Sequence, residues 1–158
     1  MRCLWLTLAD PEPRFNGQYV YSGGLIDSVA DAGGDIEVLG LGRSDTSPDT
    51  LQRADGTVWW LPSDSPRSRW RSLVSVLPHT AHRCRTSGMR HILDRLLRRG
   101  GWDGIVFDGI SAGWALARVL DHYAGRSDRP RLIYISHNHE ESLRNRIAES
   151  QPLFLKRQ

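Results

Sequence analysis

The sequence predicts an α/β fold, with an open parallel sheet and helices on both of its faces. Short, wholly apolar segments are typical of strands that are buried on both faces. These segments alternate along the chain with segments of helical periodicity, which favours parallel pairing. The 158 residues contain no internal repeat, low-complexity tract or linker, so we expect one domain spanning residues 1–158.

Five segments have the length and the apolar content of buried strands. Helical segments connect most of them, and we expect the strand order 3-2-1-4-5 of a doubly wound sheet. Gly42–Gly56, between the second and third strands, is polar and is predicted to be a loop. In chain order, the predicted strands are Cys3–Leu8, Ile36–Leu41, Thr57–Leu61, Gly104–Phe107 and Arg131–Ser136.

Helices are predicted between most of these strands. Apolar positions recur at helical spacing from Tyr19, and Gly33-Gly34 ends that helix. Gly23-Gly24 inside it would cost about 1 kcal/mol each relative to alanine. These glycines indicate either a late helix start or a backbone that another group approaches closely. The other predicted helices are a short one over Trp70–Leu77 that Pro78 ends, and the segments Ser87–Arg99, Ser111–Tyr123 and Glu140–Glu149.

Arginine dominates the charge of the chain. The formal net charge is +3, and nine arginines lie between Arg67 and Arg99 against one acid, Asp94. Such a patch suits the phosphates of nucleic acid or of an anionic membrane surface. We predict an anionic membrane or an acceptor phosphate as the partner, and no nucleic acid; the alternative is an ordinary solvated face. The arginines expected to make this contact are Arg67, Arg69, Arg71, Arg83 and Arg85.

The length of the apolar runs and the cysteine content limit which cellular compartments suit the protein. No apolar run approaches the ~20 residues that a membrane span needs. The apolar start of the chain meets Asp10-Pro11 too early for a signal peptide. The two cysteines, Cys3 and Cys84, give no disulfide framework. We therefore predict a cytoplasmic protein, peripheral at the inner face of the membrane if the arginines bind lipid.

The loops that follow the strands are the candidate sites, because ligands of such sheets bind beyond the carboxyl ends of the strands. The cluster His137-Asn138-His139-Glu140 follows the fifth strand and suits binding or acid/base chemistry, although turn and helix-dipole roles are the alternative. Asn16-Gly17-Gln18 occupies the phosphate-binding position after the first strand. It is not G-x-G-x-x-G, and no acid ends the second strand, so dinucleotide binding is weakly supported.

Two further patterns resemble catalytic or metal motifs. Gly109–Gly113 spells G-x-S-x-G, the nucleophile elbow of α/β-hydrolases, around Ser111. A hydrolase would need a carboxylate and then a histidine after further strands, but one strand and 47 residues follow, so Ser111 is predicted to cap a helix. A second set matches no strong zinc pattern and has arginine neighbours, so no metal is predicted: His79, His82, Cys84 and His91.

A set of motifs occurs in a fixed order along the chain. They are Tyr21–Ile26, Ala32–Val38, Leu77-Pro78 with Arg83 and Arg85, Trp102–Asp108, and Tyr134–Glu140. Together they resemble the N-terminal domain of family-4-like glycosyltransferases of the GT-B architecture. The likeness covers nearly the whole chain, and it rests on the order and spacing of the motifs because no single motif is diagnostic.

The resemblance implies a Rossmann-like domain that forms one half of a GT-B fold. A nucleotide-sugar donor would pass its sugar, with retained configuration and without metal or cofactor, to a lipid-linked or saccharide acceptor in cell-envelope polysaccharide assembly. His137 would be catalytic, by hydrogen bonding to the transferred sugar or the acceptor hydroxyl. The implied substrate-binding residues are Asn16, Gly17, Gln18, Asp108, Asn138 and Glu140.

The chain departs from this family in two motifs and in length. Relatives often have Gly-Gly where this chain has Asn16-Gly17, and this difference affects how closely a phosphate can approach. They often have Gly-His where this chain has Gly33-Gly34. A C-terminal domain usually carries most donor contacts, and this chain ends at Gln158. We therefore expect these 158 residues to be inactive alone. The alternatives are a free-standing, non-catalytic α/β binding module and, less favoured, a serine hydrolase using Ser111.

Overall fold

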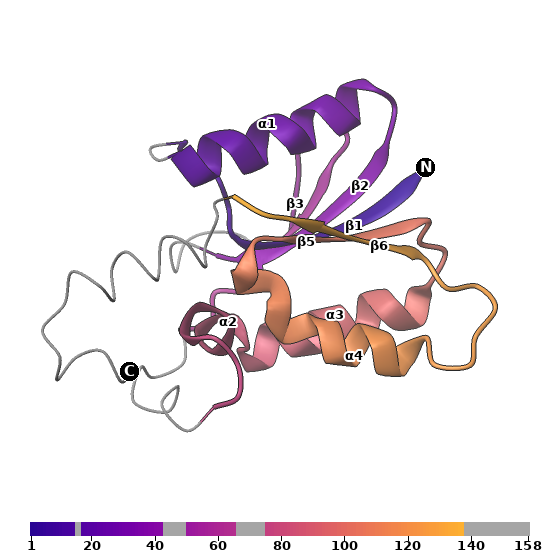
Figure 1. Ribbon diagram of the computed structural model, residues 1–158. Coiled ribbons are helices and arrows are strands. Elements are labelled where there is room, and N and C mark those ends of the chain that lie inside the picture. Colours follow the sequence, from indigo (N-terminus) through magenta and orange to yellow (C-terminus); the bar gives the residue numbers. More distant parts are fainter. Residues whose placement is uncertain (15–16, 43–49, 66–74, 138–158) are drawn as a thin grey trace, which may run out of the picture.

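A computed structural model describes residues 1–14, 17–42, 50–65 and 75–137 of the chain. Within these ranges a six-stranded sheet has the order β3-β4-β2-β1-β5-β6 (Figure 1). Its described strand pairs are parallel, apart from the antiparallel pair β3 and β4 at one edge. The strands are β1 (Arg2–Ala9), β2 (Asp35–Leu41), β3 (Thr50–Gln52), β4 (Val58–Trp60), β5 (Gly104–Asp108) and β6 (Arg131–Ile135).

The observed strand order confirms the predicted one. The five predicted strands correspond to β1, β2, β4, β5 and β6, which lie in the expected order 3-2-1-4-5. The prediction of a loop over Gly42–Gly56 was wrong at Thr50–Gln52, which forms β3 against β4. All three residues of β3 are exposed, so the strand has no apolar run by which the sequence could reveal it.

Helices cover both faces of the sheet, as predicted. In Figure 1, α1 lies on one face, and α2, α3 and α4 lie on the other. The 3-10 helix η2 packs in the same core as α3 and α4. Helices on both faces explain why the strands are apolar throughout, because the side chains on each face of the sheet pack against a helix. The helices are α1 (Gly17–Asp31), α2 (His79–Cys84), α3 (Ser87–Arg99), η2 (Ile110–Ala115) and α4 (Leu116–His122).

Some of the predicted helix boundaries differ from the observed ones within the described residues. Residues 75–77 are not helical, and Pro78 precedes α2 as its N-cap instead of ending a helix, since proline suits a helix start. The rest of the helix predicted to end at Leu77 lies largely outside the described residues. The segment Ser111–Tyr123 is divided into η2 and α4. The predicted helix Glu140–Glu149 also lies outside the described residues.

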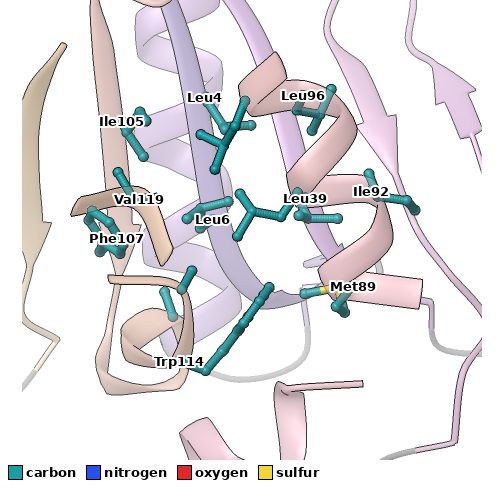
Figure 2. Close-up of a cluster of buried hydrophobic side chains, with 14 of the residues drawn as sticks. Leu4, Leu6, Leu39, Met89, Ile92, Leu96, Ile105, Phe107, Trp114 and Val119 are labelled. Atoms are coloured by element: carbon teal, nitrogen blue, oxygen red, sulfur yellow. The ribbon is translucent and has the colours of Figure 1, made fainter. Parts of the chain in front are cut away.

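Two apolar cores hold these layers together. On one face, side chains of β1, β2 and β5 pack against α3, η2 and α4 (Figure 2). The members that Figure 2 labels are Leu4, Leu6, Leu39, Met89, Ile92, Leu96, Ile105, Phe107, Trp114 and Val119. On the other face, Trp5 and Val106 pack with Ile26 of α1. Leu4 and Leu6 lie on the opposite side from Trp5 because successive side chains of a strand alternate between faces.

A buried acid links four elements of the fold. Glu37 of β2 accepts hydrogen bonds from Arg2 (3.0 Å) and from the indole of Trp60 (2.9 Å). Arg99, at the end of α3, forms an ion pair with the same carboxylate at 2.5 Å. Burial raises the pKa of Glu37, but the hydrogen bonds from Arg99, Trp60 and Arg2 outweigh it and hold the pKa below its ordinary value. Glu37 is therefore ionised in the fold and ties β1, β2, β4 and α3 together.

Candidate functional site

The loops after β1, β5 and β6 converge at the carboxyl edge of the sheet. In Figure 1 the start of α1 and the ends of β5 and β6 lie at this same edge. A pocket of about 480 Å³ opens there, lined by Gly17, Gln18, Tyr21, Ser136 and His137. This volume is within the range of small-molecule sites in proteins. We call it the His137 pocket.

A buried carboxylate, that of Asp108, contacts the imidazole of His137 and fixes its position in this pocket. The carboxylate of Asp108, at the end of β5, has no solvent exposure and contacts Nε2 of His137 through one of its oxygens. The other oxygen of Asp108 accepts a hydrogen bond from the indole Nε1 of Trp5, at 3.1 Å. Because a carboxylate can only accept, Nε2 of His137 is the donor in this contact. In the neutral tautomer that carries its proton on Nε2, Nδ1 is the hydrogen-bond acceptor.

Gly109 allows His137 to approach the end of β5 closely. Its φ angle is +78°, in the region that favours glycine, and its N–H donates to the carbonyl of Ile135 at 2.9 Å. A Cβ at this position would lie 3.1 Å from Cδ2 of His137 and 3.9 Å from the side-chain nitrogen of Gln18. The position therefore joins the loops after β1, β5 and β6 in one tightly packed corner.

Tyr21 and Ser136 line the pocket but were not among the predicted site residues. Tyr21 lies one helical turn after Gly17, and its ring meets that of His137 edge to face, with centroids 5.3 Å apart and planes at 85°. The spacing of four residues in a helix that begins at Gly17 is the signal that could have found Tyr21. Ser136 also lines the pocket. It directly precedes the predicted site residue His137, and this adjacency is the signal that could have found it.

The loop between β1 and α1 is fixed at both ends by ion pairs. Arg14 forms ion pairs of 2.6 Å with Glu12 and with Asp27 of α1. Its guanidinium lies against the backbone of α1, where a Cβ on Gly23 would be 2.8 Å from it. This contact supports the second of the two interpretations, a backbone that another group approaches closely, at Gly23 but not at Gly24, where an added Cβ would meet no described atom within 4 Å. At the other end, Asp10 pairs with Arg53 at 2.7 Å.

The other predicted site residues fall into two groups. Arg83 of α2 and Arg85 directly after it are described, but neither lines the His137 pocket. Arg85 instead lines a separate, smaller pocket with Asp64 and Arg90 at the start of α3. The remaining ones lie outside the described residues: Asn16, Arg67, Arg69, Arg71, Asn138 and Glu140.

Ser111 does not have the geometry of a nucleophile elbow. Its side chain is buried, and its hydroxyl lies 3.5 Å from the carbonyl oxygen of Asp108, to which it donates. No residue other than glycine has a positive φ angle in the described ranges, so Ser111 lacks the sharp, strained turn of an elbow. The prediction that Ser111 caps a helix was also wrong, because the N-cap of η2 is Gly109 and makes no side-chain cap.

The residues considered as a metal set do not form a metal site. Within the described part of the chain, no group of three or more His, Cys, Asp or Glu residues is arranged to hold an ion. Burial raises the pKa of Cys84 to about 11, so its thiol stays protonated and is a poor metal ligand.

Within the described residues, none of the helices has the length and apolar content to cross a membrane.

The chain resembles a solved glycosyltransferase structure. Sucrose-phosphate synthase from Thermosynechococcus elongatus, a GT-B glycosyltransferase, superposes with a TM-score of 0.57 at 14% sequence identity. The match covers 97% of this chain and 35% of the synthase chain. The chain has a GT-B-like fold. At this identity the likeness shows the fold and not the family, and the chain spans about a third of the synthase's length.

No protein-family model matches the sequence, and no curated protein sequence matches it. The GT-B-like fold agrees with the architecture that the motif order implies, in which a ligand site lies beyond the carboxyl ends of parallel strands. The His137 pocket lies at that edge of the sheet.

Proposed function

We propose that this chain is the acceptor-side domain of a retaining glycosyltransferase, which moves a sugar from a nucleotide-sugar donor to a lipid-linked or saccharide acceptor. The observation that supports the proposal best is the convergence of Gly17, Gln18 and His137 on one pocket, with Asp108 behind His137. In a GT-B-like fold this edge of the sheet faces the place of reaction. The pocket offers hydrogen-bonding groups that suit hydroxyls.

His137 is the residue to which we assign the catalytic role. With its proton directed to Asp108, its Nδ1 can accept a hydrogen bond from a hydroxyl of the acceptor or of the transferred sugar. Asp108 is fully buried, so we assign it a positioning role through His137 and not a contact with substrate. Such a pair orients a group before the reaction, which is a large part of what an enzyme site contributes.

The start of α1 supplies the second part of the proposed site. The first N–H groups of a helix have no partner within the helix and carry a partial positive charge. Gly17 begins α1 and lines the pocket, so these N–H groups suit a phosphate of a lipid-linked acceptor or a donor. Among the described residues, no atom of another segment lies within 4 Å of a Cβ placed on Gly17, which leaves this backbone open to a ligand.

We further propose that a second domain holds the donor diphosphate. The GT-B architecture places two Rossmann-like domains on either side of a cleft, and the structural match spans 35% of the synthase chain. Preorganised charge around a leaving diphosphate is usually the largest catalytic contribution in such chemistry. Without it, we expect these 158 residues to bind an acceptor but to transfer no sugar at a useful rate.

Contact with an anionic membrane is also a proposal. Its support is the number of arginines between residues 67 and 99 and the exposure of Arg85 and Arg90. Sedimentation with vesicles should rise with the fraction of anionic lipid and fall at high salt. Indifference to both variables would leave these arginines as an ordinary solvated surface.

The function is tested by binding and turnover of the full chain. Calorimetric titration with methyl glucopyranoside, methyl mannopyranoside and methyl galactopyranoside should detect binding that His137→Ala removes. His122→Ala, at the end of α4 and outside the pocket, is the matched control. Incubation with nucleotide sugars should give no transfer. Transfer by this polypeptide alone would overturn the need for a second domain, and absence of binding to every saccharide would overturn the acceptor assignment.

A further inference from the structure

Among the described residues, neither burial nor a hydrogen bond or ion pair accounts for the position of Tyr21. It is 52% exposed on α1, although it is a large aromatic residue, and it lines the His137 pocket. Within the described residues its ring contact is with His137. Its neighbour Val20 is exposed to the same extent, at 53%, but does not line the pocket. An exposed aromatic ring in an otherwise polar pocket is a typical feature of ligand sites.

The rings of Tyr21 and His137 form a corner. Their planes stand at 85° to each other, and their centroids are 5.3 Å apart. A ligand that stacks flat on Tyr21 would therefore point its rim toward the polar side of the pocket, where Gln18, Ser136 and His137 lie. The corner requires a ligand with an apolar face and a polar rim.

We propose that Tyr21 is the specificity-determining residue of a saccharide-ring subsite, which stacks a hexopyranose so that its hydroxyls face Gln18, Ser136 and His137. A pyranose ring has the required chemistry, because its axial C–H bonds form an apolar face and its equatorial hydroxyls form a polar rim. The proposal rests on the proposed function and adds to it the residue that selects a ring-shaped acceptor.

In this subsite Tyr21 and His137 fix different aspects of the orientation of the sugar. Stacking on Tyr21 fixes the plane of the sugar, and a hydrogen bond to Nδ1 of His137 fixes its rotation in that plane. Open-chain polyols offer the same hydroxyls without a rigid apolar face, so they should bind less well. Nucleosides stack as well as sugars do, but they lack a rim of hydroxyls around the stacked ring.

The test is an NMR titration of the full chain with methyl glucopyranoside, and with sorbitol and uridine as comparison ligands. We expect Tyr21→Leu to weaken pyranoside binding by roughly three- to tenfold, the range of an aromatic contact, and to remove the upfield shift of the sugar C–H protons. Tyr21→Phe keeps the ring and should recover most of the affinity. Val20→Ala, exposed to the same extent, should leave binding unchanged.

The outcomes separate this inference from the proposed function. If His137→Ala weakens pyranoside binding and Tyr21→Leu does not, the stacking subsite is wrong while the acceptor function stands. If uridine or sorbitol binds more tightly than the pyranoside and depends on Tyr21, the saccharide assignment of the subsite is wrong. If the unaltered chain binds no saccharide, the proposed function fails and the subsite fails with it.

Discussion

Asp108 and His137 come from neighbouring parallel strands and meet beyond their carboxyl ends, where the buried carboxylate holds Nε2 of the imidazole. Trp5, from the strand on the other side of β5, donates to the second oxygen of the same carboxylate. Three adjacent strands therefore fix the orientation of one side chain at the edge of a pocket.

The Asp108→Asn variant tests whether this contact sets the state of His137. An amide can donate as well as accept, so it no longer forces the proton of the imidazole onto Nε2. We expect a change in the tautomer of His137 by nitrogen-15 NMR, weaker pyranoside binding, and a loss of about 1–3 kcal/mol in the free energy of unfolding. Asp128→Asn, in an exposed pair with Arg126, is the control and should change neither the tautomer nor binding. An unchanged His137 tautomer in Asp108→Asn would refute the positioning role.

The Gly17→Ala variant tests whether the start of α1 forms part of the binding surface. An added methyl meets no atom of another described segment within 4 Å, so the fold should tolerate it. It should nevertheless reduce ligand affinity about fivefold, because overpacking of a contact surface costs about 1 kcal/mol or more. Gly24→Ala is the matched control, since its Cβ is equally free and Gly24 lies outside the pocket. Equal affinity of the two variants in calorimetry would exclude Gly17 from the site.

Glu37 predicts how the fold responds to acid. Its pKa is lowered in the folded state, so its contribution to stability is fully present above its unfolded pKa near 4.5. That contribution is lost as the pH falls below this value toward the folded pKa, because protonation breaks the pairs with Arg2 and Arg99. Glu37→Gln should cost about 2 kcal/mol at pH 7 and less at pH 3, measured by urea unfolding at both values. A cost that is the same at both pH values would contradict this role.

Ser111 allows a direct test of the hydrolase alternative. Because its hydroxyl is buried and is bonded to the carbonyl of Asp108, we expect no covalent labelling by a fluorophosphonate probe. Mass spectrometry of the intact chain measures this directly. Labelling that Ser111→Ala abolishes would restore the hydrolase.

The sheet could be predicted from the sequence because burial on both faces demands continuous apolar segments. Segments such as Cys3–Leu8 and Gly104–Phe107 are recognisable by this pattern alone, and their order follows from the connections between them. The exposed strand β3 could not be predicted, because its pairing with β4 leaves no trace in hydrophobicity. Pro78 was misread because proline is compatible with the start of a helix as well as with its end.

The site was predictable in position but not in detail. Topology alone brings the loops after β1, β5 and β6 to one edge of the sheet, where Gly17 and His137 line the same pocket. Side-chain packing that no local sequence pattern encodes buries Asp108 against His137. The same packing places the indole of Trp5 where it donates to the Asp108 carboxylate. Tyr21 was missed as a site residue because its role depends on the angle between two rings.

The histidine ring signals during titration with methyl glucopyranoside show at which pocket the sugar binds. His137 lines the pocket at the carboxyl edge of the sheet, whereas His122 lines a separate pocket between α3 and α4. We expect a saturable shift of the His137 ring protons and none for His122. A shift at His122 with no change at His137 would place the sugar at the other pocket and refute binding at the His137 pocket.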